Sequence, residues 1–543
     1  KLNNITTVQE QTAPMPYQSS SNGAWTNEST WLHGDVWDIE NLPNKDWSIV
    51  NIKNRVTTNA SHTHLGLIID NNKTLVVNGD NEIKNTWYLE LNGVLNLKNE
   101  SQLVQTRLSE LKVTSSGKII RRQQGTNNVY RYNYWSSPVG VQSTVANNTD
   151  FSLNMLSDAN GAIQFTTGYT PPVTTPATLS TYWLYTYKNG FNYYQWAPLD
   201  ENSGIEAGVG YSQKGTGVGT TDFEYFFEGK PNNGDILISV NDAGGPGSVG
   251  GISKTQYLLG NPYPSAIDAN AFIDDNEGLI NGAVYLWEQW AGNSHVLNQY
   301  EGGYAILNKL TGVRAYQFVG LDGADTGVQS GTKTPKRYIP VAQGFMAEIV
   351  GSGNVEFNND QRVFKTEVSG ESQFLRSSSN TTQNNDASEM QIMRLEFETS
   401  NHLIRELVLG FGNNTGDDVF DYGYDAKAND FFANDLLSTL NNEKYAIQAY
   451  STIQSDKEVA LVLNSDATVT YSIRMTEVEN IDDDQVIYLY DTLEGVYHDL
   501  RTGDYNFSAT AGEDATRFKI VFNSGESLSN EDFEAANDIS IFV

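Results

Sequence analysis

Few side chains of this sequence are arranged for chemistry, and the clearest candidates are oxygen ligands. An acidic loop carries carboxylates at Asp417, Asp418, Asp421 and Asp425. Carboxylates are the ligands that Ca²⁺ prefers, so the loop predicts a calcium site, although its spacing is not that of an EF-hand and a solvated turn is the alternative. A second acidic stretch, 482–484, is a weaker candidate because successive side chains on a strand point to opposite faces.

Histidines and tryptophans provide the other possible ligands. His62 and His64 are two residues apart, which places both rings on one face of a strand. A metal could bind there, but no third ligand follows from the spacing, and ordinary surface histidines explain the pair better.

Exposed tryptophans could stack on the apolar faces of sugars, whereas most tryptophans of a β-sandwich belong to its core. Trp183, Trp196, Trp287 and Trp290 are the candidates. Trp287 and Trp290 are the favoured glycan-binding pair, since one strand cannot bury both rings on one face.

Catalytic signatures are missing from the sequence. It contains no His-Glu-x-x-His, no P-loop and no Gly-x-Ser-x-Gly. The glycine-rich segment 215–219 lacks the strand-to-helix context of a dinucleotide loop and is interpreted as a hairpin turn. There are no cysteines, which excludes thiolate catalysis, disulfides and cysteine-bound metals. Many carboxylates leave a glycosidase pair open, but we expect no enzyme, and calcium is the one cofactor predicted.

Charge restricts the partners of the chain. The net charge is −32, because Lys and Arg are scarce rather than because acidic residues form blocks. Such a surface repels nucleic acid and anionic lipid, so no nucleic-acid partner is expected; it serves either solubility or the attraction of cations. No apolar run approaches the ~20 residues that span a bilayer, so we expect no integral membrane protein. The opening Lys-Leu-Asn-Asn and the missing signal peptide indicate a processed piece of a longer precursor.

Aliphatic residues recur with a fixed period in the first part of the chain. Three columns have a spacing of 22 residues: Leu67, Leu89 and Leu111; Ile69, Leu91 and Val113; Leu75, Leu97 and Ile119. This period predicts a β-solenoid of about three 22-residue coils, in which each coil buries its apolar face against its neighbours. A stack of antiparallel hairpins is the alternative. Trp25 and Trp31 are expected to cap the first coil.

The predicted fold class is all-β, a short β-solenoid followed by two β-sandwich regions. Abundant Tyr, Phe, Trp and Gly favour pleated strands joined by tight turns. The expected divisions are a linker or edge segment (1–22), the solenoid (23–124), an aromatic-rich sandwich (125–365), a polar linker (366–388), a second sandwich (389–523) and a terminal tether (524–543). One helix is predicted near 430–437.

Several short phrases resemble motifs of large surface proteins exported by the type IX secretion system, including adhesins of gliding bacteria. The phrases cover residues 134–138, 227–235, 259–268, 342–345, 357–362, 421–427, 445–448 and 503–507. Leu-Gly-Asn-Pro-Tyr-Pro-Ser at 259–265 is the most specific. The resemblance spans most of 125–523, the region that precedes the C-terminal sorting domain in such proteins. No sorting domain follows Val543 in this sequence.

The resemblance implies an extracellular protein at the surface of a Gram-negative bacterium. Its implied partners are the type IX outer-membrane translocon and shuttle protein during export, and a surface polysaccharide or another cell-surface protein as ligand. The resemblance brings no catalytic residues. The expected function is therefore a non-catalytic adhesin or display module. The alternatives are a carbohydrate-binding module of a secreted polysaccharide-degrading protein and, third, a β-helical polysaccharide lyase.

Overall fold

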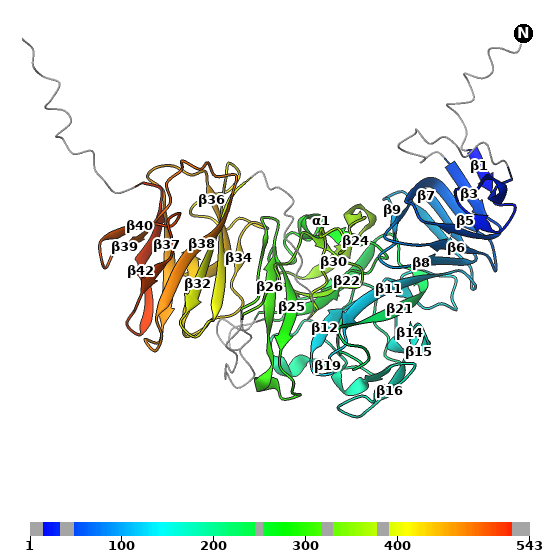
Figure 1. The fold of residues 1–543 in the computed structure, drawn as a ribbon, viewed down its shortest axis with the longest axis horizontal. Coiled ribbons are helices and arrows are strands. Elements are labelled where there is room, and N and C mark those ends of the chain that lie inside the picture. The colour runs from blue at the N-terminus through cyan, green and yellow to red at the C-terminus, as the bar shows by residue number, and fades with distance from the viewer. Residues whose placement is uncertain (1–14, 33–47, 245–253, 317–329, 377–389, 524–543) are drawn as a thin grey trace, which may run out of the picture. The chain divides into compact units, whose positions relative to one another are not determined.

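The computed structural model describes residues 15–32, 48–244, 254–316, 330–376 and 390–523 (Figure 1). The described chain is nearly all β, as predicted, and its one α-helix is α1 (Ala269–Asp275). None of the helices in the described ranges has the length and apolar character needed to cross a membrane. The chain divides into unit 1 (residues 1–387) and unit 2 (residues 388–543).

Two parallel ladders form the predicted β-solenoid at the start of unit 1. One runs through β1 (Met15–Gln18), β3 (Ser48–Ile52), β5 (His62–Ile69), β7 (Glu82–Leu91) and β10 (Glu110–Val113), and β9 (Gln102–Gln105) also pairs with β7. The other runs through β2 (Gly23–Ala24), β4 (Arg55–Thr58), β6 (Thr74–Val77), β8 (Val94–Leu97) and β11 (Lys118–Thr126). Neighbouring strands are parallel throughout, which excludes a stack of antiparallel hairpins.

The registers confirm two of the three aliphatic columns. These are Leu67, Leu89 and Leu111, and Ile69, Leu91 and Val113. The third column is wrong, because Leu75 lies opposite Leu95 rather than Leu97. Ile119 also pairs with Leu95. The cause is the length of the turns: β6 starts five residues after the end of β5, whereas β8 starts three residues after the end of β7.

An aromatic cap covers the first coils, as predicted. Trp25 is buried, and its ring stacks on His62 at 4.1 Å and meets Trp31 edge-on at 4.9 Å. His64 is also buried beneath this cap. The interpretation of His64 as a surface histidine was therefore wrong. Residues 15–22 belong to the solenoid through β1, and residues 1–14 of the expected linker lie outside the described residues.

The solenoid sheet continues into the aromatic-rich region without a boundary near residue 124. β11 pairs with β8 on one side and along its whole length with antiparallel β21 (Asp222–Pro231) on the other. The expected separate sandwich of 125–365 is instead a group of smaller sheets fused to the solenoid. The larger ones are β12 (Tyr132–Trp135), β20 (Tyr211–Lys214), β18 (Tyr185–Thr186) and β19 (Ala197–Pro198), and β23 (Gln256–Gly260), β29 (Gly344–Glu348), β25 (Val284–Ala291), β26 (Glu301–Leu307) and β27 (Gly312–Val313).

The start of the expected polar linker packs against unit 1. Phe374 and Leu375 are buried, and the Phe374 ring lies 4.7 Å from that of Trp135. Arg376 pairs with Asp222 at 3.1 Å and with Glu367 at 2.7 Å. Residues 366–376 are therefore part of unit 1, and 377–389 lie outside the described residues.

Unit 2 is built on one 11-stranded sheet with a single apolar core. Its order is β40 (Val496–Asp499), β39 (Tyr488–Asp491), β42 (Gly512–Val521), β37 (Glu458–Ser465), β35 (Asp435–Leu440), β36 (Glu443–Ser451), β33 (Ile404–Gly412), β32 (Gln391–Thr399), β38 (Tyr471–Glu479) and β41 (Tyr505–Phe507), with β34 (Ala426–Lys427) beside β36. Strands from both halves of this order, such as β32 and β42, supply the same core.

The helix predicted near 430–437 was wrong. Residues 435–440 form β35, which is paired on both sides by β36 and β37. Leu436, Leu437 and Ser438 are all buried, so both faces of the strand are covered. A strand buried on both faces lacks polar–apolar alternation, and its short apolar run resembles a helix segment.

Candidate binding surface

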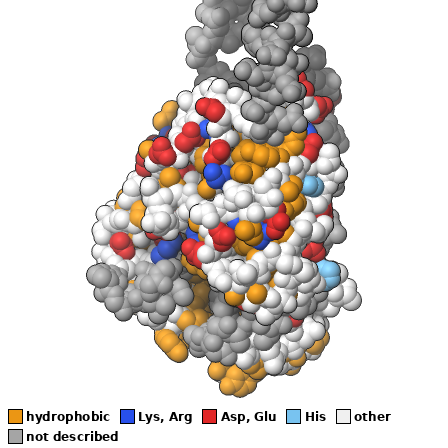
Figure 2. Space-filling view, turned by 90° about the vertical axis from the view of Figure 1, so that its left-hand side faces the viewer, with side chains coloured by type: hydrophobic (Ala, Val, Ile, Leu, Met, Phe, Trp, Pro, Cys, Tyr) orange, Lys and Arg blue, Asp and Glu red, His pale blue; other side chains and the backbone are white. Residues whose placement is uncertain are grey.

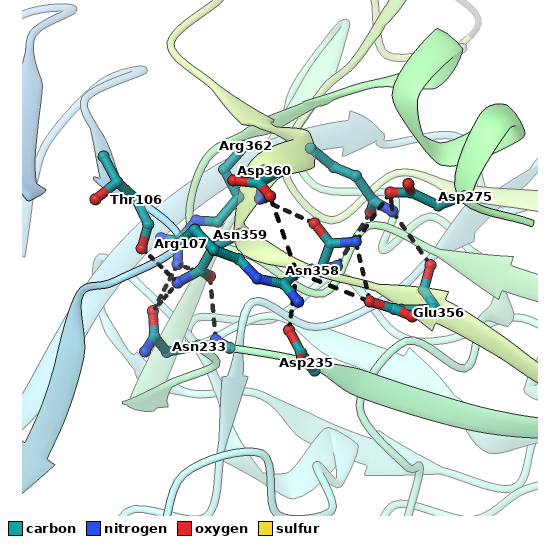
Figure 3. A network of polar contacts seen from close by, with 12 residues as sticks. Thr106, Arg107, Asn233, Asp235, Asp275, Glu356, Asn358, Asn359, Asp360 and Arg362 are labelled. Carbon is teal, nitrogen blue, oxygen red and sulfur yellow. Dashed lines mark hydrogen bonds and ion pairs between the residues drawn. The ribbon is translucent and has the colours of Figure 1, made fainter.

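Three of the motifs that carry the resemblance, 227–235, 259–268 and 357–362, meet at a polar joint inside unit 1 (Figure 3). At its centre the buried guanidinium of Arg362 donates hydrogen bonds to the Leu103 carbonyl (2.6 Å), Asn233 Oδ1 (2.9 Å), Asn359 Oδ1 (3.0 Å) and Ser265 Oγ (3.3 Å). Burial lowers its pKa to about 9. These acceptors come from the solenoid and from three separate motifs, so one side chain connects them all.

Further amides and a lysine attach the motifs to the last coils of the solenoid. Asn359 Nδ2 donates to the Thr106 carbonyl at 3.0 Å, and Asn233 Nδ2 donates to the Ser109 carbonyl at 3.1 Å. The buried Lys230 ammonium donates to the carbonyls of the last turn, those of Thr114, Ser115 and Gly117. These side chains thus hold the last turns of the solenoid through its backbone carbonyls, of which those of Thr106 and Thr114 also accept from the N–H groups of Ser109 and Gly117.

The outer rim of the joint is charged and accessible. Arg107 lies 3.2 Å from Asp235, 3.9 Å from Glu356 and 4.0 Å from Asp360, and 45% of its side chain is exposed (Figure 3). Exposed pairs of this kind contribute little, about 0–1 kcal/mol. The motif phrases of unit 1 thus have a structural role, and the candidate binding surface lies in another part of the unit.

An aromatic array of Tyr130, Tyr169, Tyr182, Trp183 and His295 provides such a surface. Its rings are continuous: Tyr182 lies 4.3 Å from Tyr169 and 4.7 Å from Trp183, Trp183 stacks on His295 at 4.6 Å, and His295 lies 4.7 Å from Tyr130. The members come from the loop before β12, from the loop between β16 (Gln164–Thr166) and β17 (Thr178–Ser180), from the turn after β17, and from the segment before β26. Tyr169 and Tyr182 are its exposed corner, at 58% and 43%.

A buried lysine lies behind the array. Lys214, on β20 opposite Tyr132, holds its ammonium 3.7 Å from the Trp183 ring centre and 4.7 Å from those of Tyr132 and Tyr300. It donates to the Tyr300 hydroxyl at 2.8 Å and lies 3.1 Å from His295 Nδ1. Among the residues that the structure describes, the partners of this ammonium are aromatic ring faces, a hydroxyl and an imidazole.

Burial in this cage shifts two pKa values. Desolvation lowers the pKa of Lys214 to about 7. Desolvation, followed by the nearby Lys214 charge, lowers the pKa of His295 to about 4, so the imidazole is neutral at pH 7. A neutral ring with Nδ1 accepting from Lys214 leaves Nε2–H to donate to Thr170 Oγ1, 3.2 Å away.

Hydrogen bonds hold the exposed corner in place. The Trp183 indole donates to the Tyr169 carbonyl at 2.6 Å, and Ser180 Oγ donates to the Gly168 carbonyl at 2.5 Å. Parallel pairing of β16 with β17 closes the base of the loop. The two tyrosine rings are inclined at 56°, with their hydroxyls 3.4 Å apart, so they form a corner rather than a flat stack.

More tyrosines continue the surface. Tyr185 lies close enough to Tyr169 that its pKa is raised, chiefly by burial and then by that neighbour. Tyr193 is in turn close to Tyr185 and Tyr194, and burial, followed by these neighbours, raises its pKa. Tyr193 and Tyr194 are 43% and 80% exposed. The dense tyrosines of 182–194 are the sequence signal that could have indicated this surface.

The two tryptophans predicted to bind glycans, Trp287 and Trp290, are buried to different extents. Trp287 is 5% exposed and lies 5.1 Å from Tyr304 and 6.1 Å from Tyr134, so it belongs to the core and offers no open ring face. Trp290 is half-buried at a bulge of β25, between Gln289 and Ala291. Of the other two, Trp183 is buried within the array and Trp196 is half-buried.

The predicted calcium loop uses its carboxylates for protein contacts. Asp417 pairs with Lys457 at 2.6 Å, and Asp421 accepts from the Gly416 N–H at 2.8 Å. Buried Asp425 accepts from the backbone N–H groups of Ala449 (2.7 Å) and Asp421 (2.9 Å), while Asp418 is exposed. The described residues contain no cluster of three or more His, Asp or Glu poised around one metal position. Calcium binding by this loop stays a prediction.

Comparison with known proteins places the chain in a family without assigning an activity. No curated protein and no solved structure matches it. The family described as "Domain of unknown function (DUF8693)" matches residues 17–522, which include the solenoid, the joint, the aromatic array and unit 2. The chain therefore belongs to the DUF8693 family.

Proposed function

We propose that the chain is a non-catalytic binding and display module of an exported bacterial surface protein. The observation that carries this proposal is that unit 1 uses one set of residues for structure and exposes a different set. The motifs resembling type IX cargo hold the solenoid to the rest of the unit through Arg362, Lys230 and paired amides, while Tyr169 and Tyr182 of the aromatic array are exposed on a fixed backbone. A stiff support with an open binding surface is what a display protein requires.

The surface charge supports an extracellular role. On the face shown in Figure 2, acidic side chains are scattered among uncharged ones rather than gathered in a block. With a net charge of −32, this distribution favours solubility outside the cell and disfavours nucleic acid. The proposed partners are the type IX translocon and shuttle protein during export, and a surface polysaccharide or another surface protein afterwards.

A carbohydrate-binding module is the second candidate function. It is favoured by Tyr169 and Tyr182, which present open rings on a loop anchored by Trp183. Aromatic faces with polar neighbours are typical of sites for sugars.

A polysaccharide lyase built on the solenoid ranks last. Tyr88, Glu90 and Lys112 lie together on its surface, with Tyr88 OH 2.6 Å and Lys112 Nζ 3.2 Å from Glu90. Burial, followed by the hydrogen bond to Glu90, raises the pKa of Tyr88 to about 12. A general base that works near neutral pH needs the opposite shift.

Protease treatment of intact cells tests the proposed location. Cells that produce the protein are treated with an impermeant protease and probed with an antibody against unit 1, in a parent strain and in one lacking the type IX translocon. We expect digestion in the parent, and intracellular protection in the translocon mutant. Protection in both strains, with digestion only after lysis, would contradict surface display.

A further inference from the structure

We infer that the exposed corner of the aromatic array, Tyr169 and Tyr182, is a binding site for an uncharged polysaccharide. This inference rests on the proposed function, since it supplies the ligand class for the binding surface. The corner is the accessible end of a ring system whose inner members are packed and hydrogen-bonded.

The corner is preorganised for a sugar. Its rings are 58% and 43% exposed, yet the backbone beneath Tyr169 is fixed by the Trp183 indole and that beneath Gly168 by Ser180. Tyrosine has few rotatable bonds, so a ring on a fixed backbone loses little entropy when it binds. The apolar C–H faces of pyranose rings suit such rings, while sugar hydroxyls need polar groups beside them.

Those polar groups are present at the edge of the array. The Tyr169 and Tyr182 hydroxyls lie 3.4 Å apart, and the Thr170 hydroxyl lies 3.2 Å from His295 Nε2. Each hydroxyl both donates and accepts, as a sugar hydroxyl requires. Stacking faces and hydroxyl partners are thus combined at one corner, between the loop that carries Tyr169 and Thr170 and the turn that carries Tyr182.

The charge of the surroundings selects an uncharged ligand. Lys214 is the cation whose contacts with the array are seen, but it is 3% exposed and enclosed by Trp183, Tyr132 and Tyr300, so it cannot reach a carboxylate on a ligand. His295 is neutral at pH 7. The net charge of −32 further opposes the approach of polyanions such as uronic-acid polymers.

Further exposed tyrosines of unit 1 favour a polymer as the ligand. Tyr193 and Tyr194 have ring centres 6.1 Å apart and are 43% and 80% exposed. Several rings in succession can contact successive sugars of one chain. A polysaccharide gains from this repetition, whereas a monosaccharide uses only one contact.

Affinity electrophoresis of the full chain tests the inference. The probes are three neutral polymers (laminarin, mannan and galactan) and two anionic ones (alginate and polygalacturonate). We expect retardation by at least one neutral polymer. The double variant Tyr169→Ala/Tyr182→Ala should weaken that interaction by about tenfold or more, because both stacking faces are lost.

Two further variants show whether the rings themselves are responsible. Tyr169→Phe/Tyr182→Phe keeps both faces and should retain most of the retardation. Trp87→Ala removes a ring of similar exposure (50%) from the solenoid and should change nothing. Thermal unfolding of each variant verifies the fold, and Tyr182→Ala alone serves as the test if the double variant is unstable.

Three results would overturn the inference: no retardation by any neutral polymer, retardation by the anionic polymers alone, or unchanged retardation of the alanine variants. None of these bears on location, which the protease experiment decides separately. If the protein is at the cell surface but is not retarded by neutral polymers, only the glycan site is contradicted. If the protease experiment finds the protein inside the cell, surface display is contradicted, whatever the result of affinity electrophoresis.

Discussion

The guanidinium of Arg362 lies 4.8 Å from the centre of the Tyr263 ring, and it donates to the Leu103 carbonyl at 2.6 Å. Tyr263 in turn donates from its hydroxyl to the Gly234 carbonyl at 2.6 Å. The phrases 259–268 and 357–362, which are far apart in the sequence, therefore meet the solenoid at the buried guanidinium of Arg362. Because Arg362 has no carboxylate among its described hydrogen-bond acceptors, its charge is held by neutral oxygens and one ring face.

Replacement of Arg362 should destabilise unit 1 strongly. Arg362→Met removes the side-chain donor to the Leu103 carbonyl and one of the two donors to each of Asn233 Oδ1 and Asn359 Oδ1, which costs about 3–5 kcal/mol of unfolding free energy. Urea unfolding at pH 7, followed by tryptophan fluorescence, measures the loss. Arg107→Met, at the exposed rim of the same joint, is the matched control and should cost about 0–1 kcal/mol. Equal losses for the two variants would contradict the central role of Arg362.

The aromatic cage should make stability depend on pH through Lys214. Its pKa is about 7 in the folded chain and has its ordinary value of 10.5 in the unfolded chain. Between these values the unfolded state binds more protons, so stability rises as the pH rises. Wild type should therefore gain unfolding free energy relative to Lys214→Met between pH 6.5 and pH 9.5, values chosen to bracket most of this window.

Urea titrations of both proteins at the two pH values measure this difference. The comparison with Lys214→Met isolates one lysine from buried Lys230 and Lys333, whose pKa values desolvation lowers to about 8 in each case. Lys188→Met, at an exposed lysine paired with Glu206, is the control and should run parallel to wild type. If wild type did not gain unfolding free energy relative to Lys214→Met toward high pH, the cage would not hold a destabilised cation.

Asp425 should give unit 2 the opposite pH dependence. Burial raises its pKa to about 7, although the Ala449 and Asp421 N–H groups oppose the shift. Between about 4 and 7 the folded state binds more protons than the unfolded state, so its stability falls as the pH rises. Hydrogen exchange of unit 2 peptides should show that wild type loses protection relative to Asp425→Ala as the pH rises from about 4 to 7. Exchange rates are corrected for their intrinsic pH dependence, and the exposed Asp418→Ala should follow wild type.

Calcium binding by the acidic loop can be tested through its effect on the carboxyl groups of Asp421 and Asp425. An ion bound to Asp421 and Asp425 would favour the carboxylate forms and so remove the loss of stability near pH 7. It would also have to compete with Lys457 for Asp417. Added calcium that raises the unfolding temperature of wild type, but not of Asp425→Ala, would establish the predicted site. Identical curves in calcium and in chelator would contradict it.

The sequence predicted the features that depend on local spacing, but it did not predict the contacts between distant segments. Leu67 and Leu89 stack as expected because 22 residues separate them and both coils place these residues at matching points of parallel strands. Leu97 was misplaced because the spacing does not reveal which turn is shorter. Asp435–Leu440 resembled a helix because a strand covered on both faces has no alternation.

The candidate surface could not be predicted, because its rings come from segments on different sheets. Nothing local distinguishes exposed Tyr182 from buried Trp183, although they are neighbours in the sequence. Trp287 was chosen because one strand cannot bury both it and Trp290 on one face, yet its place on a central strand of the five-stranded sheet decided its burial. Exposure is a property of the tertiary arrangement, and only the structure reveals it.

The aromatic cap should control how readily the first coils open. Trp25 is 5% exposed, stacked on His62 and in edge contact with Trp31, so Trp25→Ala removes a large ring and leaves a cavity at the end of the solenoid. Such truncations cost about 3–5 kcal/mol, and each coil of a solenoid is held mainly by its neighbours, so the loss should be local. Hydrogen exchange should speed up in β3 and β5 while β11 and the polar joint remain protected. Trp87→Ala, at a half-exposed ring on the same solenoid, should leave exchange unchanged within about 0.5 kcal/mol. Faster exchange throughout unit 1 would mean that the cap and the joint unfold as one cooperative unit.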